Sequence, residues 1–271
     1  MQWLVKLSQF RPLMRRRPKG QSFLELALVL PILLLILLGL IEVANYIGRY
    51  LDAIDLTREA TRFASVRDPF AVTASSDEDC STPESFEFYY DIACIFSPPQ
   101  TVECQAADDP FCNGLNPYIT LDPATDDVVI SVYTVEGANL VSDTHPKSGS
   151  GSDSATDEGG ETTNYWALSN TSWGGGPGTN NWSKDCEGSV VRDHPYYTLT
   201  HIQEIVDPAA YGSTRVAAPA SKGFVAVEVY YCYDQVLSLP IFTIFVPDPI
   251  MIHAYTIMPL PAAAPTPTPK P

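Results

Sequence analysis

The chain has 271 residues, and its 16 basic and 32 acidic side chains give a formal net charge of −16 at pH 7. Proteins that bind nucleic acid need basic surface to displace the counterions of the phosphates, so this charge argues against that class. The basic residues are unevenly placed, because six of them and no acidic residue lie within the first 20 positions. They are Lys6, Arg11, Arg15, Arg16, Arg17 and Lys19.

An apolar stretch follows this basic segment. Residues 26–41 carry no charged and no hydrogen-bonding side chain. A helix over this stretch is ~24 Å long at ~1.5 Å per residue, and extending it from Phe23 to Ala44 reaches the ~30 Å thickness of the hydrocarbon core. We therefore predict one membrane-spanning helix, with Glu25 and Glu42 near the two interfaces.

The basic segment sets the expected orientation of this helix. Basic residues next to a span stay on the cytoplasmic side, so we expect a cytoplasmic N-terminus and an extracytoplasmic remainder. We expect that remainder to lie at the cell surface. Without residues 1–20 the formal charge falls to −22, because ten basic residues remain against 32 acidic ones.

Two kinds of proteolytic processing are considered for this N-terminus. A secretory signal needs a small-x-small site after the apolar run, and residues 39–44 offer only a poor one. The alternative is a cut before the apolar run, after Gly20. Basic residues, then Gly20 and the sequence Gln-Ser-Phe-Leu-Glu ending at Glu25, resemble the class III leader of type IV pilins and pseudopilins. The resemblance implies that a prepilin peptidase cuts after Gly20, that the new N-terminal Gln21 is methylated, and that Glu25 is the glutamate at mature position five.

Further residues narrow this resemblance. The Gly-Gln-Ser-x-x-Glu motif, the apolar run with Pro31 near its start, and residues 56–64 are similar to the TadE-like pseudopilins of tight-adherence (Flp) pilus systems, over roughly residues 15–67. The resemblance implies a minor component of pilus assembly, whose partners are other pilins or pseudopilins, the assembly machinery and the prepilin peptidase. It also implies that Glu25 meets the terminal amine of a neighbouring subunit and helps set assembly register. The alternative is an interfacial glutamate that only ends the span.

The helix is expected to continue beyond the membrane to residue 67, just before Pro69. Two apolar stripes follow the helical period on nearly opposite faces. The first consists of Ile47, Tyr50, Leu51 and Ile54, and the second of Leu56, Ala60, Phe63 and Ala64. We expect one stripe to contact partner helices and the other to carry a globular head. In the alternative, the head buries the helix on all sides.

The remaining chain is predicted to form that head, over residues 68–258, followed by a Pro-rich disordered tail over 259–271. Runs rich in β-branched residues predict strands at 128–135, 224–233 and 250–257, which we expect to form a small antiparallel sheet packed on the helix. The predicted fold class is thus α+β. Residues 86–96 and 196–206 fit either strands or short helices.

Six cysteines follow the span: Cys80, Cys94, Cys104, Cys112, Cys186 and Cys232. They form no CxxC pair and no histidine lies at zinc-finger spacing, so we expect no metal site. An extracytoplasmic compartment favours disulfides. Sequence allows 15 full pairings, among which we expect local pairs within the first four cysteines and a bridge between Cys186 and Cys232.

Residues 142–189 are rich in Gly, Ser, Thr, Asn and Asp, which predicts a mobile surface loop. Trp166, Trp173 and Trp182 are exceptions in this segment. Either they pin the loop to the head, which aromatic burial favours, or they form a platform that binds glycans or surfaces.

The sequence contains no GxSxG, HExxH or phosphate-binding motif, and His145, His194, His201 and His253 are scattered along it. We therefore expect no enzymatic activity and no cofactor. The function predicted from the sequence is that of a minor pilin or pseudopilin, inserted by its N-terminal helix after prepilin-type processing. The alternative is a single-pass, membrane-anchored surface adhesin or ligand-binding protein that enters no filament.

Overall fold

The computed structural model describes residues 21–69, 80, 88–99, 111–112, 114, 116, 118–136, 139–140, 165–206, 221–238, 243 and 246–261. The chain divides into two units, Met1–Val43 and Ala44–Pro271. The predicted leader, residues 1–20, and residues 262–271 of the predicted tail lie outside the described residues. The tail was expected to begin at residue 259, but Pro259 ends a strand and Leu260 is fully buried, so these two residues belong to the head. One helix, α1 (Gln21–Ser65), supplies the described part of the first unit and the beginning of the second.

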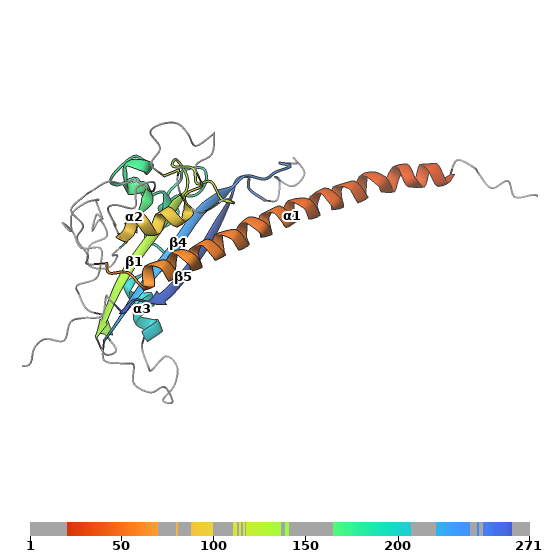
Figure 1. Ribbon diagram of the computed structural model, residues 1–271. Coiled ribbons are helices and arrows are strands. Elements are labelled where there is room, and N and C mark those ends of the chain that lie inside the picture. Colours follow the sequence, from red (N-terminus) through yellow and green to blue (C-terminus); the bar gives the residue numbers. More distant parts are fainter. Residues whose placement is uncertain are drawn as a thin grey trace, which may run out of the picture. The chain divides into compact units, whose positions relative to one another are not determined.

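The second unit is the head, and its centre is an antiparallel sheet in the order β2-β1-β4-β5, with β3 also paired to β1 (Figure 1). The strands are β1 (Asp127–Glu136), β2 (Asn139–Leu140), β3 (Trp166–Ala167), β4 (Ser221–Tyr233) and β5 (Ile250–Pro259). All three strands predicted from the sequence are confirmed, each longer by one to three residues at one or both ends. The α+β fold class is confirmed as well.

One face of the sheet packs against the head's part of α1 and against α2 (Phe88–Ala93). Alternate strand residues, such as Val225, Val227 and Val229, point to this face because successive side chains of a strand alternate. The opposing face of α1 is made of small residues that are fully buried: Ala53, Thr57, Ala60, Thr61 and Ala64. Small side chains allow the helix backbone to lie close to the sheet.

The opposite face of the sheet is covered by α3 (Leu199–Val206) and by Tyr165 and Trp182. Tyr133, Ala226 and Ile202 form one cluster on this face, and Val129 and Tyr230 join Trp182 in another. The two segments that the sequence left open between strand and helix are short helices. In the first, α2 continues into the 3-10 turn η1 (Cys94–Phe96).

Much of residues 142–189 was expected to be a mobile loop; residues 165–189 instead form a strand and short turns, and residues 142–164 lie outside the described part. The ordered portion contains β3 and the 3-10 turns η3 (Leu168–Asn170), η4 (Ser172–Gly174) and η5 (Asn181–Ser183). Trp166 and Trp182 are buried, and Trp173 packs partly buried against the core. The reading in which the tryptophans pin this segment to the head is therefore confirmed.

A buried carboxylate explains why so polar a segment is ordered. Asp127 Oδ1 accepts the N–H of Ser169 at 2.9 Å, and Asp127 Oδ2 accepts the hydroxyl of Ser169 at 2.6 Å and the N–H of Trp182 at 3.0 Å. These bonds supply acceptors for backbone groups that a polar loop would otherwise expose to water. The composition of residues 165–189 did not indicate these hydrogen bonds, because their acceptor, Asp127, lies outside that segment in β1.

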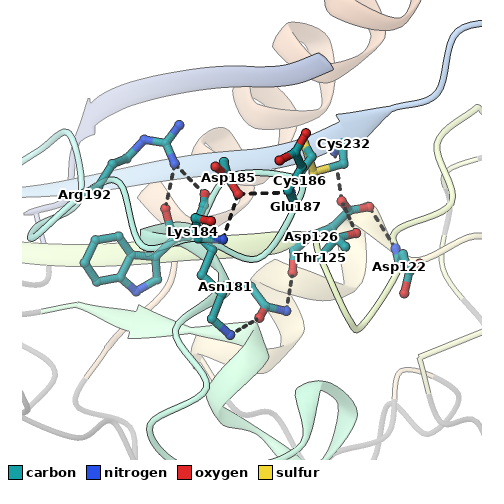
Figure 2. Close-up of a disulfide and its surroundings, with 12 residues drawn as sticks. Asp122, Thr125, Asp126, Asn181, Lys184, Asp185, Cys186, Glu187, Arg192 and Cys232 are labelled. Atoms are coloured by element: carbon teal, nitrogen blue, oxygen red, sulfur yellow. Dashed lines mark hydrogen bonds between the residues drawn. A yellow bond between two sulfur atoms is a disulfide. The ribbon is translucent and has the colours of Figure 1, made fainter. Parts of the chain in front are cut away.

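Two disulfides join described residues, Cys80–Cys94 and Cys186–Cys232. Both agree with the pairing expected from the sequence. Cys112 is also disulfide-bonded, and Cys104 lies outside the described residues. The second bridge ties the turn around Cys186 to the central strand β4, at the edge of a hydrogen-bonded group centred on Asp126 (Figure 2).

Candidate assembly segment and head cavity

The first unit consists, in its described part, of an apolar helical segment. From Phe23 to Val43 most side chains are exposed, including Leu24 at 70% and Leu28 at 68%. By its length and composition α1 is able to cross a membrane, and no residue of its most apolar window is buried inside the protein. A surface of this kind is stable in lipid and not in water. One N-terminal helix thus fits single-pass membrane anchoring.

The residues predicted for processing and assembly lie at the start of this helix. Gly20 is outside the described residues, Gln21 is the first residue of α1, and Glu25 lies in the next turn with an exposed side chain.

The two stripes of α1 in the head have different surroundings. Ala60 and Ala64 are fully buried, whereas Ile47, Tyr50 and Leu51 remain 49%, 39% and 53% exposed. Ile54, the last member of the first stripe, packs partly buried against the core. The second stripe therefore carries the head, as expected, and the alternative of a helix buried on all sides is wrong. Three large apolar side chains are left open on the other face.

The sequence analysis missed a second site, a cavity of about 510 Å³ on the face of the sheet opposite α1. Its lining comes from the segment before α3, from α3 itself and from β4 and β5: residues 191–196, Thr198, Thr200, His201, Glu204, Tyr230 and His253. Three histidines that are scattered in the sequence, His194, His201 and His253, thus line one cavity. Among the described residues, no group of three or more candidate ligands is placed to hold a metal ion.

A buried glutamate, Glu228, is hydrogen-bonded to several residues that line this cavity. Glu228 is fully buried, and its carboxylate accepts the N–H groups of Tyr196 and Tyr197 at 3.0 and 2.9 Å and the hydroxyl of Tyr230 at 2.6 Å. His253 Nε2 lies 3.1 Å from the same carboxylate. Burial, followed by the neighbouring carboxylate, raises the pKa of Tyr230, so its hydroxyl stays protonated and donates. In the sequence, the sign of this buried group was Glu228, a charged residue in the middle of an apolar strand.

Two further buried carboxylates, Asp126 and Asp127, lie at the start of β1. Asp126 accepts the N–H groups of Cys232 and Asp122, both at 2.8 Å, and the hydroxyl of Thr125 at 3.1 Å (Figure 2). Burial raises the pKa of Asp126 to about 7 and that of Asp127 to about 6, because desolvation of the charged form outweighs these hydrogen bonds.

A helix able to span a membrane, followed by a disulfide-bonded α+β head, is consistent with a single-pass anchored protein. Comparison with protein families is more specific. Residues 20–62 match the family described as TadE-like protein. The resemblance drawn from the leader motif and α1 is confirmed over these residues. No significant match was found among curated proteins or among solved structures.

Proposed function

We propose that this protein is a minor pilin or pseudopilin that takes part in assembly of a tight-adherence (Flp-type) pilus. The observation that carries the proposal is the TadE-like match over residues 20–62, which covers the start of α1 and its continuation into the head. In this proposal α1 inserts into the membrane after a prepilin peptidase removes residues 1–20. The head acts by contact with other subunits and with the assembly machinery, and it catalyses no reaction.

The exposed stripe of α1 supports assembly through helix contacts. Ile47, Tyr50 and Leu51 continue the apolar surface of the span into the head, where they stay open to solvent. Apolar side chains at i, i+3 and i+4 are the pattern by which one helix packs against another. We propose that these residues contact α1 of a neighbouring subunit.

Processing is the step that tests the proposal most directly. The expected mature chain begins at Gln21 and carries a methylated amine, as read by mass spectrometry of protein isolated from cells with an active prepilin peptidase. Replacement of Gly20 by a larger residue, Gly20→Val, should leave the intact chain, whereas the nearby replacement Ser8→Val should not. An intact Met1 chain as the functional species would contradict the proposal.

Glu25 provides a second test. The hypothesis gives it a role in register, since a carboxylate in lipid is costly until it meets a positive group on a neighbour. Glu25→Ala should then lower the yield of filaments or of complexes with other pilins, while Glu42→Ala, at the other end of the span, should not. Unchanged yield and composition after Glu25→Ala would leave Glu25 as an interfacial residue that ends the span.

The head cavity favours one alternative, a membrane-anchored adhesin or ligand-binding protein that enters no filament. A concave site of about 510 Å³ lined by tyrosines and histidines is of the size that small ligands occupy. The mature N-terminus separates the two functions, because a plain signal anchor retains residues 1–20.

A further inference from the structure

The connection between β4 and β5, residues 234–249, has the composition of a membrane-contacting loop. From Gln235 to Pro247 the sequence contains no charged residue, although the chain as a whole is strongly acidic. Val236 is 63% exposed and Val246 is 41% exposed, and Leu237 is half-buried. Residues 239–242, 244 and 245 lie outside the described part, so the structural argument rests on these three side chains.

The two ends of this connection, residues 235–238 and 246–248, are joined by hydrogen bonds and are called the neck below. The Gln235 N–H donates to Asp248 Oδ1 at 2.9 Å, and the Gln235 side-chain amide donates to the Pro247 carbonyl at 3.0 Å. The Ser238 hydroxyl donates to Asp248 Oδ2 at 2.7 Å. These bonds hold the two ends of the connection together and occupy the Asp248 carboxylate. The valines are therefore exposed on a fixed framework.

The position of the neck in the head indicates what it contacts. Tyr233, the last residue of β4, packs edge-on against Tyr46 of α1, with ring centroids 5.8 Å apart. Tyr46 follows the last residue of the predicted span, Ala44, by two residues, which is about 3 Å along a helix. If α1 crosses a bilayer, chain continuity places Tyr46 in the interfacial layer, whatever the tilt of the head.

The residues of α1 next to this contact suit such a layer. Tyr46 and Tyr50 are of the aromatic type that is enriched at membrane interfaces. Arg49 lies between them, and its guanidinium donates to the Tyr118 carbonyl. The long side chain of an arginine reaches the polar side of an interface while its stem stays in apolar surroundings. The neck of the β4–β5 connection is thus held beside an interfacial turn of α1.

We propose that the β4–β5 connection inserts Val236, Leu237 and Val246 into the interfacial region of the bilayer leaflet that faces the head. The partner is a phospholipid surface, contacted through its acyl chains and not through charge, since the connection carries no cation between its flanking aspartates. This contact is a second attachment besides α1. It restricts the tilt of the head relative to the membrane, and it is independent of any role in a pilus.

Lipid photolabelling of the full chain tests the inference. The protein is reconstituted into vesicles of phosphatidylethanolamine and phosphatidylglycerol that contain a small fraction of phosphatidylcholine with a diazirine in its acyl chain. After illumination, adducts are located by fragmentation of proteolytic peptides. Adducts are expected in the span and around Val236 and Val246, and none around Val66. Val66 is a matched control, because it is 79% exposed and lies ~30 Å from Tyr46 along α1.

Two variants test whether the labelling of the connection depends on its apolar side chains. The double replacement Val236→Asp and Val246→Asp should lower the adduct yield in the connection by about tenfold, since a carboxylate is disfavoured in that layer, while labelling of the span is unchanged. Val66→Asp should change neither yield. Adducts confined to residues 21–43 in the unaltered protein would overturn the inference and assign the exposed valines to a contact with another protein. The unaltered chain alone decides this outcome, so a variant that fails to fold does not obscure it.

Discussion

Asp126 shows how much a single buried carboxylate contributes at the residue scale. Its pKa rises from an ordinary value near 3.8 to about 7 in the folded head. A carboxyl whose folded pKa is raised contributes stability that is fully present below about pH 4 and is lost as pH rises through about 7. Asp127, with a pKa of about 6, acts in the same direction.

We therefore expect the free energy of unfolding of the head to fall by a few kcal/mol between about pH 4 and pH 7.5, at about 1.4 kcal/mol per pKa unit. Urea unfolding of the full chain in nonionic detergent, followed by the fluorescence of the buried Trp166 and Trp182, measures it. Surface carboxylates of an acidic protein contribute in the same sense, so a variant is needed to isolate Asp126. Asp126→Asn should flatten the dependence above pH 5; an unchanged slope would assign it to the surface.

Glu228 is the residue on which the cavity face depends most. Glu228→Gln replaces one acceptor oxygen by a donor that must face the N–H of Tyr196 or Tyr197 or the hydroxyl of Tyr230. A buried donor left without an acceptor costs about 1–3 kcal/mol, and we expect a loss of that size in the same urea experiment.

The control for this prediction is Glu204→Gln. Glu204 lines the same cavity but is exposed, so its replacement should change the unfolding free energy by less than about 0.5 kcal/mol. If both variants lost equal stability, the hydrogen bonds of Glu228 would not be the cause.

At the scale of elements, α1 separates two functions on two faces. Ala60→Leu inserts a large side chain at a fully buried position against the sheet, where overpacking costs about 1–3 kcal/mol. Ile47→Ala with Leu51→Ala removes exposed side chains instead, so the stability of the head should hardly change. Under the proposed function the double variant should lower subunit association, measured by cross-linking yield in membranes. Equal loss of head stability in both variants would contradict the division of faces.

The elements that the sequence predicted well are those whose pattern is local. The strand around Val225–Tyr233 alternates apolar residues because one face packs on α1, and the long helix is set by its own apolar stripes. Residues 165–189 were missed because their order depends on Asp127, which is 42 residues from Ser169. The cavity was missed for the same reason. His194 and His253 line one cavity only because β4 pairs with β5 and the segment before α3 lies over them, which no local pattern encodes.

For the whole molecule, the distribution of charge limits how copies of the head approach one another. Six of the 16 basic residues lie in the first 20 positions, so the remainder has a formal charge of −22. Like charges of this magnitude repel at low ionic strength. The apolar contacts of α1 must overcome this repulsion if identical subunits associate, whereas a basic partner would be attracted to the same surface.

Ionic strength distinguishes these two kinds of partner. Raising salt from about 10 mM to about 150 mM shortens the Debye length from ~30 Å to ~8 Å, which weakens repulsion between heads and leaves apolar contacts intact. Self-association of the chain lacking residues 1–20, measured by sedimentation in nonionic detergent, should therefore increase with salt. The Ile47→Ala, Leu51→Ala variant should show little association at either salt concentration. Association that decreased with salt would mean that opposite charges hold the complex together, and would place the contact on the acidic head and not on α1.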